Sequence, residues 1–244
     1  NVIAGIAGFA IYVISNNTLA LILGALWIIT PVIMYGVSKE KPEKKAIELL
    51  TPKEKDYILE IGKKTWEFFE KYLRKEDNFL IPDNYQEDRK NKIVRRTSST
   101  NIGLSMLAVI SANDLGFINY DKTIELLKNI LNTVDELQKW NGHLYNWYNT
   151  ETKEPLYPRY VSTVDSGNFV GYLYVIKNWL ETQNNLQSLK NEQNTNIEVL
   201  QLLEIVNKLI ENTDFSHLYQ KEQRIFSIGF NIEDNRLTDS YYDL

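Results

Sequence analysis

The sequence predicts an all-α protein. We expect an N-terminal transmembrane helix pair, then the first part of an α/α toroid or solenoid, with a short β-hairpin near the C-terminal end. Three observations predict this. Residues 2–37 are uncharged and largely apolar. Later segments repeat apolar residues at helical spacing, and in residues 224–243 apolar residues alternate with other residues. The predicted divisions are a transmembrane helical hairpin at 1–38, a cytoplasmic linker at 39–50 and an incomplete helical domain at 51–244.

The composition excludes several classes of function. The 244 residues include 27 Lys and Arg against 32 Asp and Glu, so the net charge of -5 argues against nucleic acid as the main partner. Cysteine is absent and there are two histidines, which excludes disulfide frameworks, thiolate nucleophiles and Cys/His zinc sites. No P-loop, GxGxxG turn or GxSxG elbow is present. We therefore expect no cofactor, no metal and no nucleic-acid partner.

The first apolar segment predicts insertion in a lipid bilayer. Residues 19–37 form an uncharged run, and a helix of that length just crosses a hydrocarbon core. Residues 2–14 form a second run, and the polar residues 15–18 predict a turn between the two. The positive-inside rule then predicts that the following domain is cytoplasmic, because four lysines come next: Lys39, Lys41, Lys44 and Lys45.

Two other interpretations of this segment were weighed. A signal peptide would need a basic leader and a small-residue cleavage site, and neither is present. A very apolar core hairpin of a soluble protein stays open, because Pro31 and Gly24 would kink a transmembrane helix.

The helical domain begins with a clear start signal. Thr51, Pro52 and Glu54 combine an N-cap, a first-turn proline and a capping box, which predicts a helix of about six turns. Apolar residues at helical spacing predict two more helices, near residues 100–115 and 121–139, with a hairpin closed at residues 114–117.

The second half of the domain predicts two further helices and a hairpin. One helix is expected to open at Asp165 or Ser166, and another at a capping box from Thr195 to Glu198, with the Asn/Gln-rich residues 181–196 as their linker. The hairpin is expected to turn at residues 234–235. Since the helix pairs stop part-way through such a pattern, we expect the chain to be a fragment.

An aromatic loop at residues 140–160 is the first candidate site. It holds six Trp and Tyr residues in 21 positions, interleaved with amide and charged residues. A sugar needs flat aromatic platforms and fixed polar partners, so this mixture is typical of a carbohydrate site. The alternative, that the rings only fill gaps between helix ends, is equally open. The candidates are His143, to orient a hydroxyl, with Tyr145, Asn146, Trp147, Arg159 and Tyr160.

Two polar segments flank this loop. Arg96 precedes Thr97 and Asn101 before an apolar helix and could bind a hydroxyl or carboxylate. For its hydroxyl residues we favour helix capping, with arginine paired to Glu87 or Asp88. Asp165 has a helix cap as its default role and a catalytic carboxylate as the alternative, although no second carboxylate is evident.

Five ordered strings, at residues 83–88, 96–104, 142–150, 158–168 and 240–244, resemble the glucoamylase-like central region of cyclic β-1,2-glucan synthases. The resemblance covers most of residues 50–244. Residues 27–31 also resemble the end of the membrane region that precedes this domain. The departures are Ser99, Asn149 and the Asn/Gln-rich residues 183–196, and none falls on a candidate site residue.

The resemblance implies a multidomain, multi-pass enzyme of the inner membrane. One domain polymerises glucose from UDP-glucose, a central (α/α)6 domain closes the β-1,2-glucan chain by transglycosylation, and a phosphorylase-like domain trims it. The catalytic carboxylates are expected after Leu244, so this fragment alone would be inactive. The alternatives are a glycoside hydrolase similar to endo-β-1,2-glucanases and a non-catalytic glucan-binding or scaffold module.

The resemblance also fixes the candidate substrate contacts. Asp165 is the best catalytic candidate within the chain. The full set expected to contact a β-1,2-glucan chain is Asp83, Asn84, Arg96, Thr97, Asn101, His143, Tyr145, Asn146, Trp147, Arg159, Tyr160, Ser162, Thr163, Asp165 and Asn168.

Overall fold

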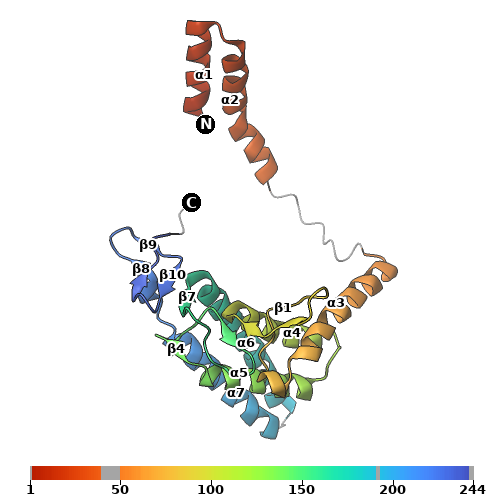
Figure 1. Ribbon diagram of the computed structural model, residues 1–244. Helices are drawn as coiled ribbons and strands as arrows, with labels where there is room; N and C mark the ends of the chain where they lie inside the picture. The colour runs from red at the N-terminus through yellow and green to blue at the C-terminus, as the bar shows by residue number, and fades with distance from the viewer. Residues whose placement is uncertain (1, 40–49, 191–192, 242–244) are drawn as a thin grey trace. The chain divides into compact units, whose positions relative to one another are not determined.

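A computed structural model describes residues 2–39, 50–190 and 193–241 of the chain (Figure 1). The chain divides into two compact units, residues 1–55 and 56–244. The described part is mostly helical, with short strands in the second unit. Most of the predicted 39–50 linker, with Lys41, Lys44 and Lys45, lies outside the described residues.

The first unit contains two helices packed on glycine. Helix α1 spans Val2–Ser15 and α2 spans Thr18–Ser38, and the Asn17 side chain caps α2 by accepting hydrogen bonds from the Leu19 and Ala20 amides. A Cβ atom added to Gly24 would lie 2.9 Å from the Gly5 carbonyl oxygen, so the two backbones approach too closely for a larger residue. The two predicted helices and their turn are therefore present.

Only α2, among the described helices, is long and apolar enough to cross a membrane. Only 6% of its most apolar window is buried, so α2 is not a helix of a protein core in this structure. Its neighbour α1 is apolar but shorter, at 14 residues. The membrane crossing of the pair stays a prediction.

Helix α3, Pro52–Tyr72, begins as the sequence predicts. The Thr51 hydroxyl accepts a hydrogen bond from the Glu54 amide at 3.3 Å, and the Glu54 carboxylate accepts one from the Thr51 amide at 2.8 Å. This reciprocal pair satisfies two amides that a helix start leaves without partners. The predicted capping box is confirmed.

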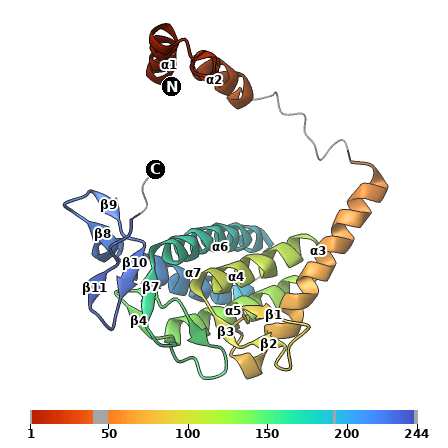
Figure 2. The same cartoon turned by 45° about the horizontal axis from the view of Figure 1, so that its top comes forward.

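Four helices form the core of the second unit. These are α4 (Ser99–Asp114), α5 (Tyr120–Glu136), α6 (Thr163–Lys190) and α7 (Gln193–Asn212). Helix α4 packs against α5 and α6, and α7 packs against α5 and α6, so two helix pairs lie side by side (Figure 2). Their shared interior contains fully buried side chains that include Ile102, Met106, Leu127, Ile130, Leu131, Leu173, Ile176, Leu180 and Leu202.

This arrangement agrees with repeated helix pairs, but the closed toroid is not confirmed. The predicted hairpin at residues 114–117 is present. Gly116 follows the C-cap residue Leu115 of α4 and has φ +75°, a conformation that glycine adopts without strain.

Two predicted boundaries are wrong. Helix α6 begins at Thr163, before Asp165, because the Ser162 hydroxyl accepts a hydrogen bond from the Asp165 amide and supplies the cap. The described residues of the expected linker, 181–190 and 193–196, are helical instead: α6 continues to Lys190 and α7 begins at Gln193, ahead of the expected start at Thr195. Glutamine is a good helix former, so an Asn/Gln-rich composition alone does not predict a loop.

Short strands lie between and after the helices of the second unit, with β1 and β2 beside α3 and β7 to β11 near the start of α6 (Figure 2). The predicted hairpin is present as the antiparallel pair β10–β11, with Asn235 at φ 48° in its turn. Strand β10 also pairs with β7, so the hairpin is part of a three-stranded sheet. The strands are β1 (Asn84–Tyr85), β2 (Ile93–Val94), β3 (Arg96–Thr97), β4 (Lys139–Trp140), β5 (His143–Leu144), β6 (Tyr148–Asn149), β7 (Tyr160–Ser162), β8 (Tyr219–Gln220), β9 (Ile225–Phe226), β10 (Gly229–Asn231) and β11 (Arg236–Leu237).

Candidate functional site

The first turns of α4 and α6 form the centre of the candidate site. Strand β3 leads into α4 and β7 leads into α6, so both helices begin at the same end of the unit (Figure 2). The Thr100 hydroxyl donates a hydrogen bond to Asp165 Oδ1 at 2.5 Å, and Asn168 Nδ2 donates to Thr100 Oγ1 at 3.3 Å. These contacts join residues that are 65 and 68 positions apart in the chain.

Helix capping leaves the Asp165 carboxylate available for this contact. Ser98 caps α4 by accepting the Asn101 amide at 3.1 Å, and Ser162 caps α6. The default role expected for Asp165, a helix cap, therefore belongs to Ser162. Asp165 itself lies in the first turn of α6.

Asp83 organises a second cluster beside the first turn of α4. Its Oδ2 accepts hydrogen bonds from Arg96 Nη2 at 3.1 Å and Asn84 Nδ2 at 3.0 Å, and its Oδ1 accepts one from Asn101 Nδ2 at 3.2 Å. Since Asn101 follows Thr100, this cluster is continuous with the Asp165 contacts. We call the combined set, Asp83, Asn84, Arg96, Thr100, Asn101, Asp165 and Asn168, the polar cluster.

The expected partners of the arginines are wrong. Arg96 pairs with Asp83, not with Glu87 or Asp88, and Arg95 pairs with the buried Asp77 at 2.5 Å. Asp83 is held in place by its own backbone, because its amide donates to the Arg96 carbonyl oxygen at 2.7 Å. A short strand pairing therefore places the carboxylate next to the guanidinium.

Trp147 extends the polar cluster with an aromatic face. The Arg96 guanidinium carbon lies 3.9 Å from the centre of the Trp147 ring, a cation–π contact. Both residues are partly exposed. The pairing of β3 with β6 brings them together, since it joins Arg96 to Asn149 and Thr97 to Tyr148. A planar surface of ring and guanidinium thus lies beside fixed carboxylate and amide groups.

Arg159 belongs to a separate group. Its Nε and Nη2 donate to the two carboxylate oxygens of Glu233, at 2.9 Å and 3.3 Å, and its guanidinium lies 5.3 Å from the Tyr157 ring centre. These hydrogen bonds lower the pKa of Glu233 and raise that of Arg159. The sequence did not reveal Glu233, because only the pairing of β7 with β10 brings it next to Arg159.

Three predicted contact residues are buried. His143 is 1% exposed, Tyr145 is 3% exposed and Thr97 is fully buried. His143 Nε2 lies 3.0 Å from the Asp214 carbonyl oxygen, and burial lowers the pKa of the imidazole. None of the three presents a surface to a ligand in this structure, so their geometry fits packing.

Most of the loop aromatics also fill gaps between elements. Tyr148 is fully buried and donates a hydrogen bond to the Gln138 carbonyl oxygen, and Trp140 stacks on Phe230 with ring centres 4.3 Å apart. Of the six rings, Tyr157 is exposed, and Trp140, Trp147 and Tyr160 are partly buried. The gap-filling alternative therefore describes much of this loop.

Three other predicted residues make hydrogen bonds that hold the segments around the site in place. The Asn146 amide donates to the Tyr160 carbonyl oxygen at 2.7 Å, the Tyr160 hydroxyl lies 3.0 Å from Thr238 Oγ1, and the Thr163 hydroxyl donates to the Ser227 carbonyl oxygen. Within the described ranges, no group of three His, Asp or Glu side chains could hold a metal ion.

The sequence is similar to a curated protein. No family model matches the chain. The chain is 38% identical over 160 residues to the cyclic β-(1,2)-glucan synthase NdvB of Rhizobium meliloti (strain 1021), an alignment that covers 64% of this chain. The predicted resemblance to cyclic β-1,2-glucan synthases is confirmed. The chain spans 6% of the length of that relative.

Solved structures show the same fold. An endo-β-1,2-glucanase from Chitinophaga pinensis aligns with a TM-score of 0.62 at 13% identity, over 76% of this chain and 43% of that one. A protein from Bacteroides fragilis, provisionally assigned as a glucoamylase, aligns with a TM-score of 0.60 at 15% identity, over 79% and 43% of the chains. A β-1,2-glucanase from Parabacteroides distasonis gives 0.59 at 11% identity, over 76% and 25%. The second unit therefore has a glucoamylase-like fold.

Proposed function

We propose that the chain is part of a membrane-bound cyclic β-1,2-glucan synthase, and that its helical domain binds a β-1,2-glucan chain and takes part in ring closure by transglycosylation. The observation that carries the proposal is the polar cluster beside Trp147. It combines a partly exposed ring with oriented carboxylate, amide and guanidinium groups, which are the groups that pyranose recognition needs.

Each part of the cluster has a role in this proposal. Trp147 offers its ring to the apolar face of a glucose unit, and Arg96 offers the donors that Asp83 leaves free. Asp165 accepts one hydrogen bond from Thr100 and has acceptor capacity left for a sugar hydroxyl. It stays the best candidate for a reacting carboxylate in this chain. Glycosyl transfer normally needs a pair of carboxylates, and Asp165 has no second member at a defined distance here.

In the proposed reaction one glycosidic bond breaks and an equivalent one forms, so the atoms balance. A glycosidic C1–O2 bond of the glucan breaks, and C1 bonds to the O2 atom of the chain's own non-reducing end. The proton of that hydroxyl passes to the oxygen of the leaving sugar. Ring closure instead of hydrolysis requires that both chain segments are held while water is excluded.

The binding role is tested by substitution in the full-length enzyme. We expect Trp147→Ala and Asp165→Asn each to weaken binding of β-1,2-gluco-oligosaccharides at least tenfold and to lower cyclic product in parallel. Stacking on an aromatic ring generally contributes on the order of 1 kcal/mol in addition to the free energy of burying its apolar surface. Tyr174→Ala is the matched control, because Tyr174 is an exposed aromatic residue of α6 outside the cluster. Unchanged glucan binding in both the Trp147→Ala and the Asp165→Asn variant would contradict the proposed site.

Two alternatives are separated by their products. Hydrolysis is favoured by the fold similarity to endo-β-1,2-glucanases and predicts linear oligosaccharides without cyclic product. A non-catalytic glucan-holding module predicts binding without turnover. In both alternatives the chain binds a β-1,2-glucan.

We further propose that α1 and α2 anchor the chain in the inner membrane, with the helical domain in the cytoplasm and the polymerising and phosphorylase-like domains as partners in the same full-length protein. The absence of cysteine makes a direct test simple. In a full-length enzyme without other reactive thiols, Asn16→Cys should react with a membrane-impermeant maleimide only from the periplasmic side. Thr51→Cys should be protected until the membrane is permeabilised. Equal labelling of both positions in intact cells would contradict the proposed topology.

A further inference from the structure

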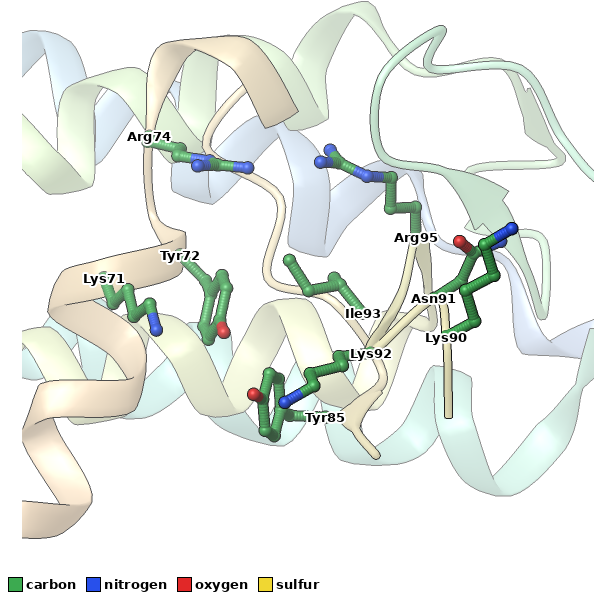
Figure 3. Close-up of a pocket in the computed structure, with 9 residues that line it drawn as sticks. All are labelled: Lys71, Tyr72, Arg74, Tyr85, Lys90, Asn91, Lys92, Ile93 and Arg95. Carbon is green, nitrogen blue, oxygen red and sulfur yellow. The ribbon is translucent and has the colours of Figure 1, made fainter. Parts of the chain in front are cut away.

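A cavity of about 690 Å³ lies beside the β1–β2 hairpin and the end of α3 (Figure 3). It is separate from the polar cluster, because neighbouring strand residues point to opposite sides. Tyr85 lines the cavity, whereas Asn84 bonds to Asp83 in the cluster; likewise Arg95 lines it, whereas Arg96 does not.

The wall of this cavity is strongly basic. Five of its nine lining residues are cationic, and none is acidic: the cations are Lys71, Arg74, Lys90, Lys92 and Arg95. The whole chain carries a net charge of -5, so this concentration of positive charge opposes the overall balance. We call these residues, with Tyr72 and Tyr85, the basic pocket.

The two arginines are already committed to protein contacts. Arg74 Nε and Arg95 Nη1 bind the two oxygens of Asp77, at 2.6 Å and 2.5 Å, and the Asp77 side chain is 2% exposed. Figure 3 shows the two guanidinium groups turned toward each other across the pocket. Asp77 therefore holds both arginines, and Glu151 also pairs with Arg95 at 3.1 Å. The structural role of the two arginines is to fix the upper wall.

The three lysines differ from the arginines. Within the described residues, no ion pair forms at Lys71, Lys90 or Lys92. The ammonium groups of Lys71 and Lys92 each lie 5.9 Å from the centre of the Tyr85 ring, which is 39% exposed. Like charges gathered around one ring repel, and an anion between them would remove that repulsion.

We propose that the basic pocket binds a phosphoryl-bearing ligand, with the phosphate held by Lys71, Lys90 and Lys92 and the group attached to it resting on Tyr85. A phosphate monoester carries between one and two negative charges, and a phosphodiester carries one; both offer several acceptor oxygens, so either can engage several ammonium groups at once. The volume suits a small molecule or a headgroup. The ligand is either a soluble phosphate ester or the headgroup of an anionic lipid.

The test uses titration calorimetry on the full chain in detergent micelles. The probes are pyrophosphate, dihexanoyl phosphatidylglycerol and, as an uncharged-headgroup reference, dihexanoyl phosphatidylcholine. We expect pyrophosphate or the phosphatidylglycerol to bind. Lys71→Gln/Lys92→Gln should weaken that binding at least tenfold. Lys55→Gln/Lys63→Gln, which removes the same charge from exposed positions of α3, should change it less than twofold.

The outcomes separate the two sources. Tighter binding of phosphatidylglycerol than of pyrophosphate identifies a lipid headgroup, and the reverse identifies a soluble ester. The proposal is overturned if neither probe binds, if phosphatidylcholine binds as well as phosphatidylglycerol, or if both double variants weaken binding equally. None of these results bears on glucan binding, because the polar cluster shares no residue with the basic pocket.

Discussion

Apolar residues face opposite surroundings in the two units of the chain. In the first unit, large apolar side chains such as Ile3, Ile14 and Val32 are 84%, 86% and 72% exposed. In the second unit, helices α4 to α7 bury one apolar face each in a shared core, although a few large side chains such as Leu104, Tyr174 and Ile197 stay exposed. The first unit holds its helices together by glycine contacts, whereas the second does so by interlocking side chains. Hydrophobicity alone therefore does not stabilise a fold in water; burial does.

The largest effect should come from a cavity in the second unit. Leu173 is fully buried between the helices, so Leu173→Ala should lower the free energy of unfolding by roughly 2–5 kcal/mol, measured by urea titration of the full chain in micelles. The matched change Ile33→Ala, on the exposed surface of α2, should leave that transition unchanged. Equal losses from both changes would remove the contrast between the units.

A smaller effect is expected at the junction of the two units. Thr51→Ala removes the hydroxyl that caps α3, and the loss should be about 1 kcal/mol. Thr51→Ser keeps the hydroxyl and should behave like the parent chain. If the alanine variant loses nothing, the start of α3 does not contribute to the stability of the second unit.

The smallest effect at neutral pH should come from His143. Burial lowers the folded-state pKa of its imidazole, so acidification protonates the unfolded chain first. The stability from neutral His143 is complete above the unfolded pKa of about 6.5 and is lost as the pH falls through the lower folded value. His143→Gln, which can keep the hydrogen bond to the Asp214 carbonyl oxygen, should reduce this loss between pH 7 and pH 5. An unchanged pH profile would show that another group is responsible.

Local signals in the sequence predicted the helices well, because their causes are local. The capping box at Thr51 and the apolar spacing of α4 and α5 depend on residues within a few positions of each other. The end of α6 was missed, because its Asn/Gln-rich sequence has composition typical of a linker, whereas Gln favours helix.

The candidate site was predictable in its residue types but not in its contacts. Arg96, Trp147 and Asp165 were identified from the sequence, whereas the ion pair of Arg159 with Glu233 joins positions 74 apart and depends on strand pairing. The burial of His143 and Tyr145 was equally hidden, since an aromatic loop has no periodicity that distinguishes packed rings from exposed ones.

Asp83 is a shared acceptor for Arg96, Asn84 and Asn101, and this arrangement has a consequence for energetics. Because the three donors depend on one carboxylate, removing Asp83 should free all of them at once. Double-mutant cycles between any two donors should then give a non-zero coupling energy, and pairs that include Asp83 should show the strongest non-additivity.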